Sequence, residues 1–120
     1  MTLQEYQERA MLTCMPTCDN LLYMLGLIHE EAGELQGKVN KAMRKKLIKF
    51  VDNKAVWTGT QEELEDFHAD CQKELGDVIW AVAGTAKVFG WDLCGVAQTN
   101  LDKLADRYDR GVIDGQGDNR

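Results

Sequence analysis

The chain has 120 residues, of which 44% are hydrophobic and 28% are charged, a composition typical of one soluble globular domain. Its 20 acidic and 14 basic residues give a net charge of −6, which argues against nucleic acid or an anionic membrane as the main partner. No apolar run approaches the ~20 residues of a membrane span, and the N-terminus lacks a basic segment followed by an apolar one. We therefore expect a single cytoplasmic domain over residues 1–120.

The four cysteines do not have the spacing of a zinc site. Cys14 and Cys18 lie four residues apart around Pro16, and Cys71 and Cys94 form no second close pair. We expect free, mostly buried thiols in a reducing compartment, with a redox or metal role as the alternative.

The first two helices are predicted from their capping residues. Thr2 and Glu5 form a capping box, so a helix should begin there and run to about Cys14. Asp19 is the expected N-cap of a second helix, which should continue to about Leu47.

The second predicted helix contains an unusual acidic stretch, with Glu30, Glu31 and Glu34 inside five residues. On a helical wheel these carboxylates lie at the border of the apolar stripe, where a partly dry site can form. The expected stripe is Leu21, Met24, Ile28, Ala32, Leu35, Val39 and Ala42.

Three glycines of the same helix, Gly26, Gly33 and Gly37, gather on a third face. Because glycine inside a helix costs up to about 1 kcal/mol relative to alanine, we expect another backbone to approach closely there. That backbone would come from within the bundle or from a second copy of the chain.

Helical periodicity fails after this helix, and Asp52-Asn53 and Thr58-Gly59 are turn signals. We expect residues 48–59 to form a loop, and no strands anywhere in the chain. Trp57 in this loop is either a hydrophobic plug or a lid that stacks on a base.

A third helix is expected from a capping box at Thr60 and Glu63 to about Phe89, with Gly90 just past its end. Its expected stripe is Leu64, Phe67, Cys71, Leu75, Val78, Val82 and Phe89. Glu74 and Asp77, three residues apart at the side of this stripe, repeat the acidic spacing of the second helix.

Asp92 should cap a fourth helix from Leu93 to about Tyr108. Its residues Val96, Leu101, Leu104 and Ala105 are expected to pack inward. The glycine-rich tail 111–120 should be flexible or ordered only by a ligand. The predicted fold class is all-α, a bundle of about four helices.

Two acidic pairs on facing helices suggest a site for hard divalent cations. Glu31, Glu34, Glu74 and Asp77 could together hold one or two Mg²⁺ ions, which prefer oxygen ligands and bridge to substrate phosphates. Lys38 continues the acidic face by one turn, so it is a candidate phosphate contact. Asn100, Lys103 and Arg107 share one face of the fourth helix and suit a phosphate with a sugar or base edge.

At these residues the chain resembles a known family. Glu30-Glu31-x-x-Glu34 followed by Glu74-x-x-Asp77 is similar to the signature of MazG-like nucleotide pyrophosphohydrolases, members of the all-α NTP pyrophosphatase superfamily. Asn100-x-x-Lys103-Leu104-x-x-Arg107 and the tail from Gly115 resemble the end of small, single-domain members.

The resemblance implies a fold, a reaction and a set of roles. The reaction would be Mg²⁺-dependent cleavage between the α and β phosphates of a nucleoside triphosphate, giving a monophosphate and pyrophosphate; Mn²⁺ could replace Mg²⁺. The implied metal ligands are Glu31, Glu34, Glu74 and Asp77. Glu30 would position the attacking water as general base or help to hold a further metal. A homodimer or homotetramer is also implied.

Two other readings of the sequence remain open. An acidic helical adaptor that dimerises through its glycine face would need no metal. A di-iron carboxylate bundle needs two E-x-x-H motifs, of which Glu65-x-x-His68 supplies one and the segment before His29 supplies none.

Overall fold

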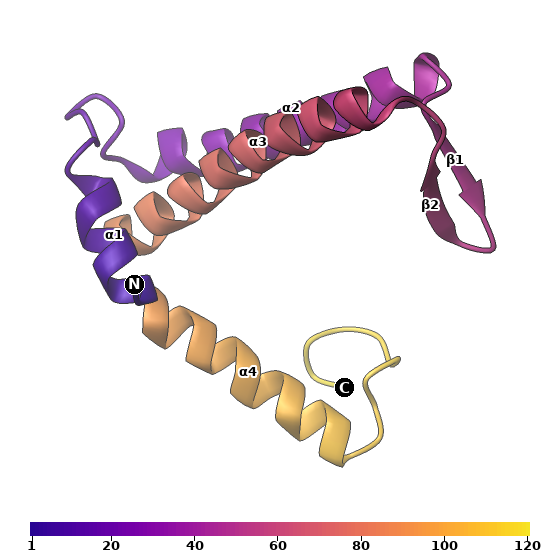
Figure 1. Cartoon of the computed structure of the whole chain (residues 1–120). Helices are drawn as coiled ribbons and strands as arrows, with labels where there is room; N and C mark the ends of the chain where they lie inside the picture. The colour runs from indigo at the N-terminus through magenta and orange to yellow at the C-terminus, as the bar shows by residue number, and fades with distance from the viewer.

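The computed structural model describes residues 1–120 and is mostly helical, as predicted (Figure 1). The elements in chain order are α1 (Leu3–Met11), α2 (Leu21–Arg44), β1 (Ile48–Val51), β2 (Lys54–Trp57), α3 (Gln61–Val88) and α4 (Leu93–Asp109). None of the helices has the length and apolar character that a membrane crossing requires.

Three of the predicted helix starts are confirmed. The capping boxes of Thr2 with Glu5 and of Thr60 with Glu63 are both complete. The Asp92 side chain accepts a hydrogen bond from the Gly95 backbone at 2.7 Å. These starts depend only on local hydrogen bonds, which explains why neighbouring sequence predicts them well.

The predicted N-cap of α2 is wrong by one residue. Asn20, not Asp19, caps the helix, and its Oδ1 accepts from the Tyr23 backbone at 2.9 Å. Asp19 instead pairs with Lys87 of α3 at 2.8 Å. Asp and Asn are both good N-cap residues, so the local sequence does not distinguish Asp19 from Asn20. The ion pair of Asp19 with Lys87, which is distant in the sequence, agrees with Asn20 as the cap.

Residues 48–57 form a β-hairpin, so the prediction of a strandless loop over 48–59 and a purely α-helical chain is wrong here. The strands pair antiparallel, from Ile48 opposite Trp57 to Val51 opposite Lys54. Asp52 and Asn53 have φ angles of 50° and 61°, as a tight hairpin turn of the primed type requires. Each strand has only four residues, too few for alternation to stand out.

The chain has an open V shape (Figure 1). Helices α2 and α3 run side by side as one arm with the hairpin at its far end, α4 forms the other arm, and α1 lies at the corner. The radius of gyration is 17.8 Å, whereas a compact chain of this length has about 13–14 Å. Only nine of 120 residues are buried.

The corner of the V contains the small apolar core. Buried Ala83, Ala86 and Leu93 pack together there, joined by Tyr6 and other partly buried side chains. Buried Gln7 of α1 donates to the carbonyls of Ala83 and Trp91, and accepts from the Leu93 backbone at 2.9 Å. One amide side chain therefore connects α1 with the end of α3 and the start of α4.

The first arm has a close contact of its own. Met24 of α2 is fully buried, and a Cβ added at Gly84 of α3 would overlap its side chain. Gly26, Gly33 and Gly37, by contrast, have no atom within 4 Å of such a Cβ. Their expected packing within the bundle is therefore wrong, and the alternative of a second copy stays a prediction.

The inward packing predicted for α4 is also not found within the chain. Val96, Leu101 and Leu104 are 37%, 59% and 41% exposed. Among the apolar residues of α4, Leu93 in the first turn is buried; the other buried residue of the helix is Arg107, which the tail covers. The apolar spacing identifies a helix face, but no element of this chain covers that face.

Candidate metal centre

The acidic cluster lies on the first arm, where α2 and α3 run alongside each other. Glu31 of α2 and Glu74 and Asp77 of α3 each place a carboxylate oxygen within 4.8 Å of the others. The two α3 residues are three apart, so the helix brings them to one face. The structure thus brings together three of the four residues predicted as metal ligands.

Burial and charge act together on Glu31. Its side chain is half-buried, and this burial raises its pKa above the ordinary value. The carboxylates of Asp77, Glu34, Glu30 and Glu74 raise the pKa further. A carboxylate in such surroundings is stabilised by a cation, which would remove the repulsion between these groups.

The donor set of the cluster fits a hard divalent cation. All three groups are carboxylates, and Mg²⁺ takes oxygen ligands at about 2.0–2.1 Å in octahedral geometry. Ligand oxygens around such an ion lie about 3–4 Å apart, so oxygens within 4.8 Å need only a small inward movement. Three protein ligands also leave coordination positions for water and substrate.

Lys38 of α2 provides a positive charge at this cluster. Its Nζ lies 3.0 Å from Glu74 Oε1, and its side chain is 35% exposed. The hydrogen bond and the charge of Glu74 raise the pKa of Lys38. The lysine predicted as a phosphate contact is therefore held next to the carboxylates.

Glu34 and Glu30 lie outside the group of three and are exposed. Glu34 faces a neighbouring cavity of about 480 Å³ between α2, α3 and the base of the hairpin. The lining includes Glu34, Lys38, Lys41, Lys45, Trp57 and Phe67. The acidic centre thus continues into a hollow lined by lysines of α2, by acidic residues of α3 and by the Trp57–Phe67 pair.

Trp57 stacks on Phe67, with ring centroids 5.3 Å apart. Its Nε1 donates to the Thr60 carbonyl at 3.0 Å. Because the indole is half-buried and its donor is satisfied, these contacts favour the plug over the base-stacking lid.

Tyr6 of α1 is a neighbour of the centre that the sequence does not indicate. Burial raises its pKa, and the Asp77 carboxylate raises the pKa further. The apolar spacing of α1 places Tyr6 on the buried side, but nothing local shows that this side faces the acids of α3.

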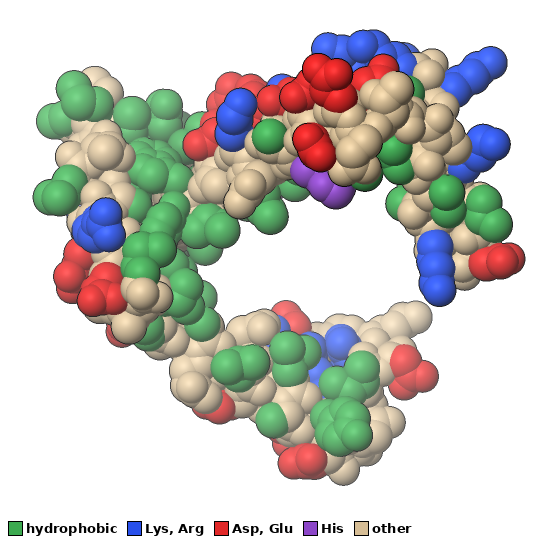
Figure 2. Space-filling model, in the orientation of Figure 1, with side chains coloured by type: hydrophobic (Ala, Val, Ile, Leu, Met, Phe, Trp, Pro, Cys, Tyr) green, Lys and Arg blue, Asp and Glu red, His purple; other side chains and the backbone are tan.

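The predicted substrate contacts of α4 lie elsewhere in the chain. Asn100, Lys103 and Arg107 belong to the second arm of the V (Figure 1). Figure 2 shows acidic side chains along the first arm, with basic ones beside them and at the hairpin end, and a small basic patch among acidic and apolar side chains on the second arm. Of the four predicted substrate contacts, Lys38 is therefore the one that lies at the acidic centre of its own chain.

Histidine takes no part in the cluster. His29 and His68 are exposed, and His29 Nδ1 lies 2.8 Å from the carbonyl of Leu25 in its own helix. The ligand set of a di-iron bundle is therefore not assembled in this chain.

Carboxylates are among the ligands that Mg²⁺ takes in proteins that act on phosphates. The model of the MazG nucleotide pyrophosphohydrolase domain matches residues 20–112, and the chain belongs to this family. A curated relative, the Gene 37 protein of Mycobacterium phage L5, is 46% identical over 96 residues, covering 80% of this chain and 72% of the relative. No solved structure matches the chain.

Proposed function

We propose that the chain is a Mg²⁺-dependent nucleoside triphosphate pyrophosphohydrolase. Water would attack the α phosphorus, and the bond between this phosphorus and the oxygen that bridges it to the β phosphate would break. Pyrophosphate would then leave, and a nucleoside monophosphate would remain. The observation that carries this proposal is the convergence of Glu31, Glu74 and Asp77 from two helices within 4.8 Å. Membership of the MazG family supports the reaction class.

Glu31, Glu74 and Asp77 would hold the metal, and Glu34 would complete the set from the adjoining cavity. When bound, Mg²⁺ neutralises phosphate charge and acidifies water. Glu30, exposed next to Glu31, would accept the proton of the attacking water or help to hold a further ion. Mn²⁺ has the same ligand preferences and would replace Mg²⁺.

Lys38 would move from Glu74 to a substrate phosphate. The two groups are 3.0 Å apart, and the lysine also lines the neighbouring cavity. Lys38 could therefore contact a triphosphate that enters the cavity without leaving the neighbourhood of Glu74. The cavity volume of about 480 Å³ lies within the range of roughly 300–1,000 Å³ typical of small-molecule sites.

The working unit would be a homodimer or homotetramer. The accessible surface of the chain is 8804 Å², while a compact protein of 13.5 kDa has about 6,500 Å². The surplus of about 2,300 Å² is of the size that obligate subunits bury. Self-association would cover Leu101 and Leu104 of α4, and it would give the glycine face of α2 a partner.

Assembly would also unite the two halves of the substrate site. Asn100, Lys103 and Arg107 lie on the arm opposite the acids (Figure 1). A second copy of α4, placed in the open mouth of the V, would bring these residues to the triphosphate.

The direct test is the identity of the products. Purified protein with Mg²⁺ is incubated with a panel of all common ribo- and deoxyribonucleoside triphosphates, and the products are resolved by ion-exchange chromatography. The proposal expects monophosphate and pyrophosphate from at least one nucleotide. Diphosphate with orthophosphate, or no turnover of any nucleotide, would contradict it, and no turnover would favour the adaptor.

A further inference from the structure

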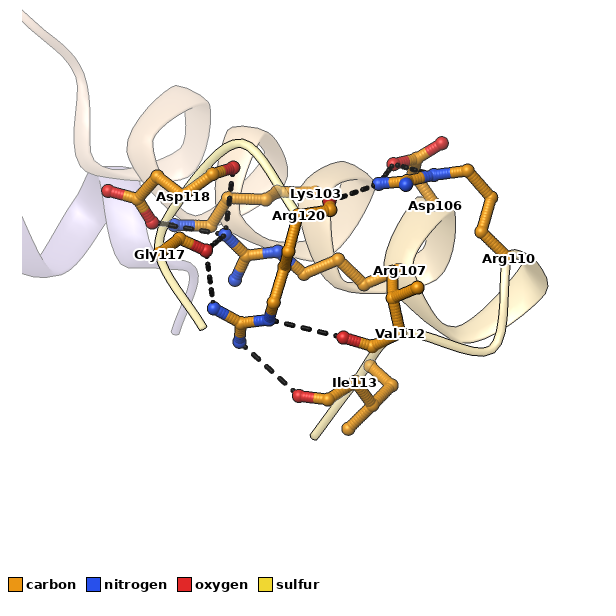
Figure 3. A network of polar contacts seen from close by, with 9 residues as sticks. All are labelled: Lys103, Asp106, Arg107, Arg110, Val112, Ile113, Gly117, Asp118 and Arg120. Carbon is orange, nitrogen blue, oxygen red and sulfur yellow. Dashed lines mark hydrogen bonds and ion pairs between the residues drawn. The ribbon is translucent and has the colours of Figure 1, made fainter. Parts of the chain in front are cut away.

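The tail after α4 folds back onto the helix and surrounds Arg107 (Figure 3). Arg107 Nη2 donates to the Asp118 carbonyl at 3.1 Å and to Asp118 Oδ1 at 3.0 Å. Lys103 Nζ lies 3.6 Å from the same Oδ1 atom. The carboxylate of Asp118 therefore sits where two cations of α4 converge.

Arg120 keeps the tail in this loop. Its Nε donates to the Val112 carbonyl at 3.1 Å, and its Nη2 donates to the Ile113 carbonyl at 3.3 Å. Its Nη1 donates to the Gly117 carbonyl, which places the segment beside Arg107. The position of Asp118 thus follows from a folded loop rather than from a single surface contact.

The contact between Asp118 and the two cations is unbalanced. The Arg107 side chain is 6% exposed, while that of Asp118 is 85% exposed. All three donations of Arg107 use Nη2, and its buried Nε has no acceptor. A buried guanidinium with an unused donor is poorly matched by one carboxylate oxygen that faces water.

We propose that Lys103 and Arg107 form an anion site that the chain's own Asp118 carboxylate occupies in the absence of ligand, and that a phosphate group displaces this carboxylate. The inference rests on the proposed function, because it describes how the α4 contacts are kept before substrate binds. The incoming ligand class is a phosphate or pyrophosphate anion.

Phosphate chemistry suits this site better than the carboxylate does. A terminal phosphate has three oxygens and more charge than Asp118, so it can accept from Lys103, Arg107 Nη2 and the unused Nε together. Asp118 is nevertheless a true competitor. Its hydrogen bond with Arg107 and the Lys103 charge lower its pKa, so it is ionised at neutral pH.

The test is calorimetric titration of the full chain with inorganic pyrophosphate in EDTA, where no metal can attach pyrophosphate to the acidic centre. Asp118→Asn removes the competing charge and is expected to tighten binding about three- to tenfold. This factor is expected if Asp118 occupies the site most of the time in the wild-type chain. Asp114→Asn is the matched control. Asp114 is exposed in the same tail and takes no part in the network of Figure 3.

Asp114→Asn makes the same change in net charge, so it should alter binding by less than twofold. Lys103→Gln should weaken binding several-fold in the wild-type and Asp118→Asn backgrounds. Equal or weaker binding by Asp118→Asn than by Asp114→Asn would overturn the proposal, as would the absence of pyrophosphate binding in all variants. An unchanged affinity of Lys103→Gln would also overturn it, because binding would then lie elsewhere.

The result separates this inference from the proposed function, because the titration needs no turnover. An inactive protein that still shows the Asp118→Asn effect would refute the enzyme and retain the anion site. An active enzyme without that effect would refute the anion site alone.

Discussion

The two arms of the V differ in how closely their helices pack within one chain, although both carry exposed apolar side chains, such as Leu22 and Leu75 on the first arm. On the first arm, α3 covers α2, Met24 packs against Gly84, and three carboxylates converge. On the second arm, α4 makes contacts at its first turn and with its own tail, while Leu101 and Leu104 face water. An exposed apolar helix face of this kind agrees with the proposal that a second copy of the chain covers α4.

A different cluster of charges marks each arm, although both arms carry acidic and basic residues. The first arm carries the acidic centre, and the second carries Lys103 and Arg107, which the tail already supplies with a carboxylate. In each arm the clustered charges have a partner of opposite sign, Lys38 for the acids and Asp118 for the cations.

The largest effect is expected when the first arm loses a proposed metal ligand. Asp77→Asn removes a charge at the centre, and turnover should fall by at least about a hundredfold, since losing even an outer-shell partner of a metal costs 10–100-fold. Steady-state product formation with Mg²⁺ measures this, and the helical circular dichroism should stay near wild type.

Glu65→Gln is the control for that substitution. Glu65 is exposed on α3 and accepts a hydrogen bond from Gln61, so its loss should change turnover by less than twofold. A similar loss in both variants would show that the acidic surface acts as a whole, and a loss of fold in Asp77→Asn would make that carboxylate structural.

The second arm is tested by placing a charge on its bare face. Leu101 is 59% exposed in the chain, so Leu101→Asp should leave the subunit folded. In an assembly the added charge would be buried without a partner, at a cost of about 3–5 kcal/mol. Sedimentation across a dilution series should therefore show dissociation at concentrations at least about a hundredfold higher than for wild type.

Thr99→Asp adds the same charge on a different side of α4, at an exposed polar position. It should leave self-association unchanged. A wild-type chain that is monomeric at micromolar concentration would remove the explanation offered here for the bare face of α4.

The connection between the arms is tested at Gln7. Gln7→Leu leaves the Leu93 N–H and the Trp91 carbonyl without this partner, and unfolding free energy should fall by about 1–3 kcal/mol. Chemical denaturation measures the change. Gln4→Leu is the control, because it removes only an exposed hydrogen bond from Gln4 Nε2 to Glu8 at 2.8 Å, and the buried Gln4 Oε1 has no partner. Equal losses in both variants would mean that Gln7 acts through packing alone.

The smallest effect is the stabilisation of the first arm by Mg²⁺. At ten times the dissociation constant it should reach about 1.4 kcal/mol, a rise of a few degrees in melting temperature. The pKa of Glu31 is raised by burial, so without metal the folded state loses stability as pH rises from the ordinary Glu value through the raised one. Metal binding offsets that loss.

The melting-temperature gain from Mg²⁺ should therefore increase with pH across this window and fall at acid pH, where protons compete for Glu31. Thermal scans with and without Mg²⁺ at several pH values measure it. Glu31→Gln should abolish both the gain and its pH dependence, and a gain that persists in this variant would place the ion elsewhere.

Sequence alone predicts those features that depend on residues close together in the chain. The boxes at Thr2 and Thr60, the cap at Asp92 and the shared face of Glu74 and Asp77 follow from helix geometry. The convergence of Glu31 with that pair needs one further step, the antiparallel pairing of two long helices, which their apolar stripes supply.

Features that depend on distant partners are not predictable in this way. The alternation of apolar and polar residues over 48–57 is too short to distinguish strands from a loop. The sequence Asp52-Asn53 does indicate the turn between them. The effect of the Asp77 charge on the pKa of Tyr6 cannot be predicted without knowing where α1 packs. The periodicity of α4 predicts that its apolar face is covered, but periodicity does not say by which chain.

Gln7 lies at the corner of the V. Its amide joins the backbones of α3 and α4 at the point where the arms diverge, so one uncharged side chain lies where the angle between the two arms is set. In any symmetric assembly this angle is repeated in every subunit. If the chain assembles as proposed, a change of this angle in a subunit would alter the distance between its acidic centre and the partner's α4, although Gln7 itself would contact neither the metal nor the nucleotide.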